Sequence, residues 1–243
     1  MYENVIVIIP SRIGATRLPN KPLEKIGKLT MIEHVYNAMK FCGISLNNVY
    51  VATDSKDIAN VIYNTDSQAQ VIMTSANCVS GTDRVYEAFT KISKDRRDVK
   101  YIINVQGDMP FLNKDIIEKV VRTIREGDCD ISTPVAKVVG SKGSDTVKVV
   151  VDNEDYALYF SRSNIPYGSN EYLYHAGIYG FNCDSLQKFV KFPYGKLESI
   201  EKLEQLRALE NGMRIKVCYI DLLPVSVDNY QDLYILQQRY SLV

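Results

Sequence analysis

Short apolar segments alternate with segments of helical periodicity through the first half of the chain. Val5–Ile9 is a continuous apolar run that ends at Pro10, a pattern typical of a strand buried on both faces. Apolar side chains then recur at helical spacing from Ile32 to Cys42, and Gly43 marks the end of that helix. The same reasoning predicts strands at Asn48–Thr53, Gln70–Met73 and Tyr101–Val105, and helices at Thr82–Ile92 and Lys114–Arg125.

This alternation of strand and helix predicts the fold class. Successive βαβ units favour an α/β fold with an open, mostly parallel, Rossmann-like sheet and helices on both faces. Binding sites in such sheets lie beyond the carboxyl ends of the strands. We therefore expect the loops that follow the strands to carry the chemistry.

The second half of the chain has a less regular pattern. Strands are expected at Ile131–Val135, Val147–Val151 and Ile178–Phe181, so residues 131–190 are predicted to form a smaller β-rich lobe within one domain of residues 1–243. Helical spacing then predicts one amphipathic helix over Leu197–Leu209, whose inner side carries Leu197, Ile200, Leu203, Leu206 and Leu209. A strand at Ile215–Ile220 and a helix at Asn229–Arg239 follow.

Charge and composition exclude some classes of function. Lys and Arg together number 29, as do Asp and Glu, and this zero net charge disfavours a nucleic-acid or membrane-surface partner. No apolar run approaches the ~20 residues that span a bilayer, and the chain starts with no signal-peptide pattern, so a cytoplasmic location is expected. The five cysteines are scattered, which predicts reduced thiols. With only two histidines, a metal site needs oxygen ligands, which favours Mg²⁺.

The loop after the first strand, residues 10–22, concentrates positive charge. It holds Arg12, Arg17 and Lys21, one glycine and no acid. Guanidinium groups and free backbone N–H groups suit a polyphosphate. The two common phosphate-binding motifs, G-x-x-x-x-G-K-[ST] and G-x-G-x-x-G, are absent, so composition alone is equally consistent with a solvated basic loop.

Two carboxylates are placed to hold a metal ion. Asp108 follows the strand at Tyr101–Val105, and a carboxylate at such a strand end suits Mg²⁺ on a nucleotide. Asp228 follows the late strand, and two acids from different strand ends can share one ion. The simpler alternatives are a turn or helix-cap role for Asp108 and an N-cap of the last helix for Asp228.

Five further positions along the chain are candidates for binding. Ser80-Gly81-Thr82-Asp83-Arg84 opens a helix, and helix N-termini bind anions. His175 starts an apolar segment, where a structural histidine is the alternative, and Glu204-Gln205 lies on the polar side of the predicted 197–209 helix, where solvated residues are common. The remaining candidates are Gln106 and Arg162.

These clusters belong to a series of motifs that resembles one family. In order along the chain they are V-I-I-P-S-R-x-x-A-T-R-L-P-N-K-P-L, V-A-T-D, S-G-T-D-R, N-V-Q-G-D-x-P, V-K-V-V-x-D, Y-A-L-Y-F-S-R-x-x-I-P-Y, H-x-G-I-Y-G-F, L-E-x-x-E-x-L-E-Q-L-R-A-L-E-N-G and V-D. The set is similar to the 3-deoxy-manno-octulosonate (Kdo) cytidylyltransferase family, the CMP-Kdo synthetases of lipopolysaccharide biosynthesis. The resemblance extends from Val5 to about Leu236.

The resemblance implies a fold of the nucleotide-diphospho-sugar transferase type and a nucleotidyltransferase reaction, CTP + Kdo → CMP-Kdo + pyrophosphate. It implies that Arg12, Arg17 and Lys21 clamp the triphosphate, with Ser80, Gly81 and Arg84 near it, and that Asp108 and Asp228 hold Mg²⁺. It assigns the sugar to Gln106, Arg162, His175, Tyr179, Glu204 and Gln205. It also implies a homodimer formed through the β-rich lobe.

One departure from the family pattern keeps other substrates open. The family often has an additional Arg before His175, whereas this chain has no cation between Arg162 and His175. A related acidic sugar, such as 8-amino-Kdo or a nonulosonic acid, is therefore an alternative substrate. A nucleotide-binding protein that has lost turnover is an alternative of another class.

Overall fold

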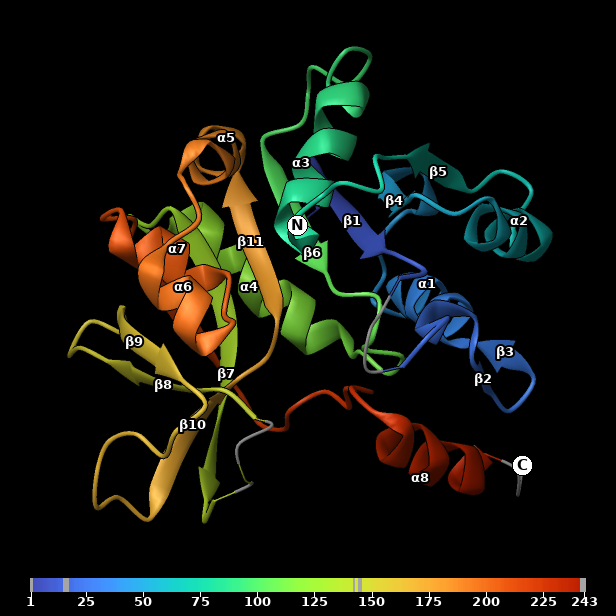
Figure 1. Ribbon diagram of the computed structural model, residues 1–243. Coiled ribbons are helices and arrows are strands. Elements are labelled where there is room, and N and C mark those ends of the chain that lie inside the picture. The colour runs from blue at the N-terminus through green and yellow to red at the C-terminus, as the bar shows by residue number, and fades with distance from the viewer. Residues whose placement is uncertain (1, 15–17, 142, 144–145, 241–243) are drawn as a thin grey trace. The chain divides into compact units, whose positions relative to one another are not determined.

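The computed structural model describes residues 2–14, 18–141, 143 and 146–240 (Figure 1). The chain divides into two compact units. Unit I consists of Val5–Asp98, Asn104–Lys114 and Pro224–Val243, and unit II consists of Met1–Asn4, Val99–Ile103 and Asp115–Leu223.

The sheet of unit I is built from the first strands of the chain. Its order is β5-β4-β1, with β1 at Val5–Ser11, β4 at Val49–Thr53 and β5 at Gln70–Met73. Both strand pairs are parallel, with Val7 opposite Val49 and Val51 opposite Val71. Every residue of β1 and β4 is buried, which explains why both strands are apolar up to their last residues, Ser11 and Thr53. The predicted open parallel sheet is confirmed here.

Local capping signals start the helices of unit I. Thr30 accepts from the backbone N–H of Glu33 in a capping box at α1 (Met31–Phe41), and Ser55 caps α2 (Lys56–Thr65). Ser80 forms a second capping box at α3 (Gly81–Ile92). The smaller elements of this unit are η1 (Lys21–Leu23), β2 (Lys25–Ile26), β3 (Leu29–Thr30), η2 (Leu46–Asn48) and α8 (Tyr230–Tyr240).

The last helix of the chain packs on the segment that follows the basic loop. Leu233 and Leu236 of α8 share a buried cluster with Leu18, Ile26 and Met31. This apolar contact brings residues near the C-terminus beside residues 18–31, and it sets the place of Asp228, which precedes α8.

The sheet of unit II is mainly antiparallel. Its order is β11-β7-β10-β8-β9, and β12 adds to β7 in parallel with Ile215 opposite Ile131. The other pairs, β11 with β7, β10 with β7, β10 with β8 and β8 with β9, are antiparallel. The strands are β7 (Ile131–Val139), β8 (Lys148–Val151), β9 (Ala157–Ser161), β10 (Glu171–His175), β11 (Ile178–Asn182) and β12 (Ile215–Ile220). β6 (Tyr101–Val105) contributes residues to both units.

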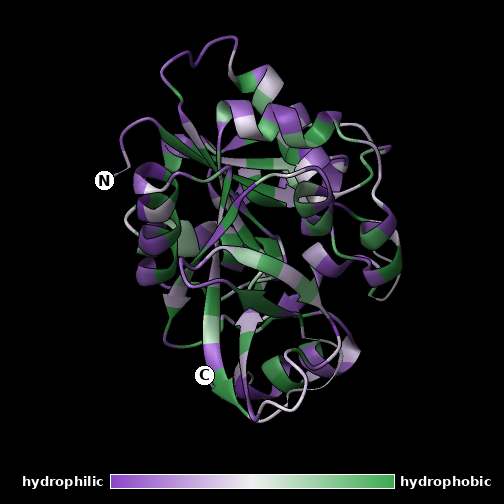
Figure 2. Cartoon of the chain, turned by 90° about the vertical axis from the view of Figure 1, so that its left-hand side faces the viewer, coloured by the Kyte–Doolittle hydropathy of each residue, from purple (hydrophilic) through white to green (hydrophobic). Residues whose placement is uncertain are grey.

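The helices of unit II are α4 (Lys114–Glu126), which begins on the last residue of a unit I segment, α5 (Cys183–Lys191), α6 (Lys196–Glu201) and α7 (Gln205–Glu210). Strands are largely hydrophobic in Figure 2, whereas the helices carry both hydrophobic and hydrophilic positions. In the part of the chain that the structure describes, no helix is long and apolar enough to cross a membrane.

Two sequence predictions for unit II are wrong or incomplete. The single helix expected over Leu197–Leu209 is two short helices, because Lys202 adopts a left-handed conformation with φ 57° and turns the chain between them. Ile200, predicted on the inner side, is 67% exposed. The pattern also missed β9, β10 and α5, which are short and carry mixed polar and apolar residues.

Candidate active site

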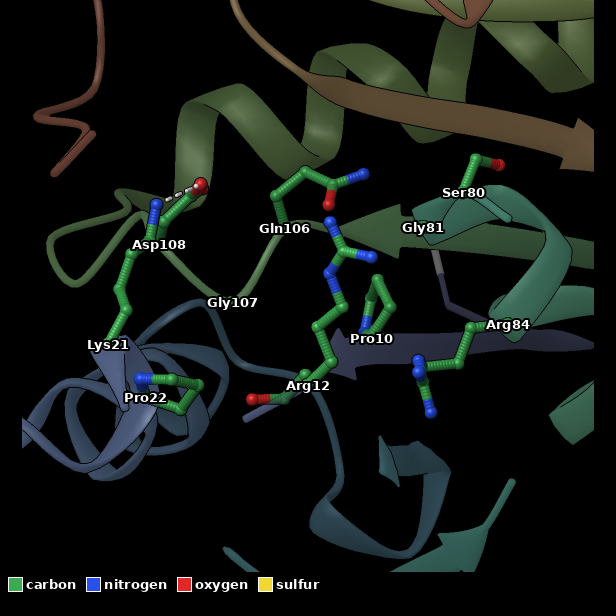
Figure 3. Close-up of a pocket in the computed structure, with 11 residues that line it drawn as sticks. Pro10, Arg12, Lys21, Pro22, Ser80, Gly81, Arg84, Gln106, Gly107 and Asp108 are labelled. Carbon is green, nitrogen blue, oxygen red and sulfur yellow. Dashed lines mark hydrogen bonds and ion pairs between the residues drawn. The ribbon is translucent and has the colours of Figure 1, made fainter. Parts of the chain in front are cut away.

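A pocket of about 240 Å³ lies in unit I, beyond the carboxyl end of β1. Figure 3 shows Arg12 and Lys21 rising from the first loop toward Gln106 and Asp108. The lining carries three cationic side chains and one carboxylate, which suits a ligand with several negative charges. The lining residues are Pro10, Ser11, Arg12, Lys21, Pro22, Ser80, Gly81, Arg84, Gln106, Gly107 and Asp108.

Two glycines allow the segments of this pocket to approach one another. A Cβ on Gly81 would lie 2.9 Å from Oε1 of Gln106, and a Cβ on Gly107 would lie 3.0 Å from the carbonyl oxygen of Pro10. Both distances are shorter than ordinary van der Waals contact. Glycine at these positions lets the start of α3 and the turn after β6 close around the loop that follows β1.

Lys21 joins the two predicted metal ligands. Its Nζ donates to Oδ2 of Asp108 at 2.8 Å and lies 3.9 Å from Oδ1 of Asp228. The side chains of Lys21 and Asp108 are only 15% and 25% exposed, which reduces solvent screening of this pair. The structure therefore brings Lys21, Asp108 and Asp228 together.

Backbone pairing sets the place of Asp228. Phe111 and Val225 form an antiparallel bridge, and the N–H of Val227 donates to the carbonyl oxygen of Asp108 at 3.0 Å. These contacts hold the segment that ends at Asp228 beside the turn that contains Asp108.

The simpler interpretation of Asp228 as the N-cap of the last helix is wrong. Asn229 fills that role, because its Oδ1 accepts from the N–H of Asp232 at 3.0 Å while the Asp232 carboxylate accepts from the N–H of Asn229. The carboxylate of Asp228 instead accepts from the Ser226 hydroxyl at 3.1 Å and faces Lys21. Asp108 lies in a turn before α4 rather than at its N-cap.

The predicted cations differ in how they are held. Arg12 is exposed and points toward Gln106 in Figure 3. Arg84 is buried, and its guanidinium donates to Asp54 Oδ2 at 3.1 Å and to Thr74 Oγ1 at 2.5 Å. Its charge is thus paired inside unit I. Arg17 lies outside the described residues.

Sequence reasoning did not assign Asp54 or Ser11 to the site. Asp54 is the acid of the V-A-T-D motif, so its place after β4 was the available signal. Ser11 is buried at the end of β1, and its Oγ has no hydrogen-bond partner among the described residues. The predicted Ser80 hydroxyl is engaged by Asp83 in the α3 capping box, and Gln106 Nε2 donates to Asn104 Oδ1 at 3.3 Å.

Apart from Gln106, which lies in unit I, the residues predicted to bind the sugar lie in unit II. The Tyr179 hydroxyl donates to Gln205 Oε1 at 3.1 Å, and the ring centroids of His175 and Tyr179 are 5.5 Å apart. Burial, followed by the charge of Glu204, raises the pKa of Tyr179 well above its usual value. The structure therefore gathers His175, Tyr179, Glu204 and Gln205.

Two expectations for this cluster are corrected. Gln205 is 3% exposed rather than on a polar surface, because the left-handed turn at Lys202 directs it inward. Its Nε2 has no hydrogen-bond partner among the described residues. His175 ends β10 rather than starting the apolar strand, which begins at Ile178.

The hydrogen bonds of His175 define its tautomer. The Thr133 hydroxyl donates to the carbonyl oxygen of Ile178 at 2.8 Å, so it must accept from Nε2–H of His175 at 2.9 Å. Nδ1 is then an acceptor. Burial lowers the pKa of His175 to about 3, so the ring is neutral at pH 7 and does not act as a proton donor there.

A parallel sheet with a cationic pocket and paired carboxylates beyond its strand ends defines an α/β protein of the nucleotide-binding class. The chain matches the family model described as Cytidylyltransferase over residues 6–215.

Two relatives are named 3-deoxy-manno-octulosonate cytidylyltransferase. That of Rickettsia africae (strain ESF-5) is 47% identical over 234 residues, which cover 96% of this chain and 93% of the relative. That of Rickettsia prowazekii (strain Madrid E) is 48% identical over 233 residues, covering 95% and 93%. The solved structure of CMP:2-keto-3-deoxy-manno-octonic acid synthetase complexed with CTP is similar with a TM-score of 0.87 and 33% sequence identity, covering 98% of both chains. The chain belongs to the 3-deoxy-manno-octulosonate cytidylyltransferase family, and its predicted α/β fold is confirmed.

Proposed function

We propose that this protein is the cytidylyltransferase that makes CMP-Kdo and pyrophosphate from CTP and Kdo, for lipopolysaccharide biosynthesis. The observation that carries the proposal is the family membership over nearly the whole chain, together with a cationic pocket that includes the family's loop residues. In this reaction the anomeric hydroxyl of the sugar attacks the α-phosphorus of CTP and pyrophosphate leaves.

Unit I is assigned to CTP. Arg12, Arg17 and Lys21 bind the triphosphate as charge-assisted hydrogen-bond donors. Ser80 and Gly81 at the N-terminus of α3 line the same pocket, where the helix end favours negative charge. Arg84 is held by Asp54, so we assign it to shaping the pocket wall as well as to binding.

Asp108 and Asp228 are assigned to hold Mg²⁺. The donor set fits, since both carboxylates reach one cationic group, the Lys21 ammonium, and Mg²⁺ typically takes one or two carboxylates and completes its shell with water and substrate phosphates. When bound, the ion supplies positive charge at the α-phosphate and the leaving pyrophosphate.

The sugar is assigned to Gln106 and to the cluster of unit II. Arg162 is suited to its carboxylate through the guanidinium fork. Neutral His175 offers Nδ1 as an acceptor for a sugar hydroxyl, and Tyr179, Glu204 and Gln205 supply further polar groups. We assign no general base among the described residues of this site, and we propose that catalysis rests on alignment and charge stabilisation.

The decisive experiment is pyrophosphate release with CTP, Mg²⁺ and a sugar panel. We expect release with Kdo at a higher kcat/KM than with 8-amino-Kdo or a nonulosonic acid. A higher kcat/KM with either of the other sugars would show that this sugar, and not Kdo, is the substrate. CTP binding without release for any sugar would instead establish a nucleotide-binding protein that has lost turnover.

We also propose a cytoplasmic homodimer. All five cysteines are free, which is typical of a reducing compartment. Val139, Leu158 and Tyr167 of unit II are large apolar side chains that are mostly exposed, which supports an interface on this unit. Sedimentation velocity tests the assembly, and a single species at the monomer mass would reject it.

A further inference from the structure

Two charged side chains of unit II bind the backbone of a single residue, Arg162, one on each side of its Cα. The N–H of Arg162 donates to Glu201 Oε2 at 3.2 Å, and the carbonyl oxygen of Arg162 accepts from Lys148 Nζ at 2.7 Å. Both backbone groups of a single residue are therefore bonded to ionised side chains. Such charge-assisted hydrogen bonds are about twice as strong as neutral ones.

Glu201 anchors the end of β9 at more than one point. Its Oε1 accepts from the Ser161 hydroxyl at 2.7 Å and from the Tyr159 hydroxyl at 3.5 Å. Glu201 is the last residue of α6, directly before the turn at Lys202. Because α6 ends at Glu201, the carboxylate of this residue reaches the end of β9. Sequence periodicity did not predict this helix end.

Lys148 is an unusual residue for such a role because it is fully buried. Its ammonium donates to the carbonyl oxygens of Gly143 at 2.5 Å and Thr146 at 3.0 Å, besides that of Arg162. Among the described residues no carboxylate lies within ion-pair distance of it. A buried cation without a counter-ion is costly, so its retention points to a use.

The burial of the Lys148 ammonium also changes its pKa. Burial, followed by the charge of Arg162, lowers the pKa of Lys148. Its ammonium has three backbone carbonyl acceptors, which satisfy all of its donors. The side chain therefore links Gly143 and Thr146 to Arg162, the residue that follows β9.

We propose that Glu201 and Lys148 are positioning residues for Arg162, fixing its backbone so that its side chain binds the carboxylate of the acidic sugar. This inference rests on the proposed function, because it assumes that Arg162 contacts the sugar. The two residues act through Arg162 and do not touch the substrate. Both residues belong to unit II, whereas the residues that line the pocket assigned to CTP belong to unit I.

The first test is the kinetics of Glu201→Leu, which removes both acceptor oxygens at similar size. We expect KM for Kdo to rise about tenfold, as for loss of one hydrogen bond to a charged group, while KM for CTP and the affinity for CTP in calorimetry stay unchanged. Glu201→Gln retains an acceptor for the Arg162 N–H and is expected to restore most of the sugar KM. Glu154→Gln, an exposed glutamate of the same unit, is the matched control.

A double-mutant cycle with Arg162→Ala separates positioning from direct binding. The Glu201→Leu effect on sugar KM is expected to disappear in the Arg162→Ala background. Additive effects, parallel increases in both KM values, or an unchanged sugar KM in Glu201→Leu would overturn the inference. An Arg162→Ala enzyme with the normal sugar KM would instead reject the carboxylate role of Arg162 in the proposed function.

Lys148→Met provides an independent arm. It keeps the length of the side chain and removes the donor to the Arg162 carbonyl, so the sugar KM is expected to rise while the CTP affinity is retained. If this variant does not fold, the Glu201 variants and their cycle decide the question. Lys196→Met, at an exposed lysine of α6, controls for loss of one positive charge.

Discussion

The Lys21 ammonium donates to the Asp108 carboxylate at 2.8 Å, across 87 residues of sequence. The same ammonium lies 3.9 Å from Asp228. A residue assigned to the triphosphate therefore contacts both residues assigned to the metal. Under the proposed function Lys21 and Mg²⁺ would compete for one Asp108 oxygen, so we expect metal binding to require the lysine to release Asp108.

Replacing Asp108 tests the metal assignment. We expect Asp108→Asn to lower kcat by about 100-fold or more, because loss of charge stabilisation in a phosphoryl-type transition state has effects of this order. Steady-state pyrophosphate release at saturating CTP and Kdo measures it. Asp95→Asn, at an exposed acid of unit I, is the control and is expected to behave like the wild type. Near-normal turnover of Asp108→Asn would reject the assignment.

Replacing Lys21 tests the competition. In Lys21→Met the carboxylates lose their ammonium partner, so Mg²⁺ alone is expected to stabilise the protein at lower concentrations than in the wild type. The KM for CTP is expected to rise about tenfold from loss of a charged contact to phosphate. Thermal melting against Mg²⁺ concentration gives the first readout and kinetics the second. An unchanged Mg²⁺ response would show that Lys21 does not compete.

Neighbouring residues before α8 are expected to separate activity from stability. Asp228→Asn is expected to lose turnover with little change in the free energy of unfolding, since Asn229 rather than Asp228 caps the helix. Asn229→Ala is expected to lose about 1 kcal/mol of stability and to retain turnover. Urea denaturation and pyrophosphate release measure the two. The reverse pattern would restore the N-cap interpretation of Asp228.

The buried His175 predicts a pH dependence of stability. Its pKa is lowered from 6.5 to about 3 in the folded protein, so between these values the unfolded chain binds a proton that the folded chain does not. The free energy of unfolding therefore falls as pH drops below 6.5, by at most about 1.4 kcal/mol per unit from this group.

His175→Gln keeps a donor for Thr133 and is expected to flatten this dependence. Urea denaturation of both proteins between pH 5 and pH 8 is the measurement. The two curves are expected to run parallel above pH 6.5 and to separate below it. Equal slopes at low pH would contradict a neutral buried ring.

The turn between α6 and α7 predicts a stabilising substitution. Lys202 is exposed and adopts φ 57°, a conformation that costs most L-residues about 1 kcal/mol and glycine almost nothing. Lys202→Gly is expected to raise the melting temperature. Ser199→Gly, inside α6 and also exposed, is expected to lower it. A lower melting temperature for Lys202→Gly would mean that the lysine side chain stabilises the turn.

Features that depend on residues close together in the chain could be predicted from the sequence. The strands β1, β4 and β6 follow from mainly apolar runs, because strands buried on both faces need few polar residues. The edge strand β5 follows from its short apolar run alone. The helix start at Ser80 follows from capping chemistry within a few residues. The basic loop after β1 and the acid after β6 were visible for the same reason, as residues that follow predicted strands.

Only the tertiary structure decided which of these residues meet. The contact of Lys21 with Asp108 and Asp228 depends on the packing of α8 and on the bridge between Phe111 and Val225, which join segments far apart in the chain. The end of α6 at Lys202 and the burial of Gln205 could not be predicted, because leucines at helical spacing fit one helix as well as two. Periodicity records which positions are buried on average, whereas the partner of each polar group depends on long-range packing. The sequence by itself determined the chemical groups available, and the fold determined which of them share a site.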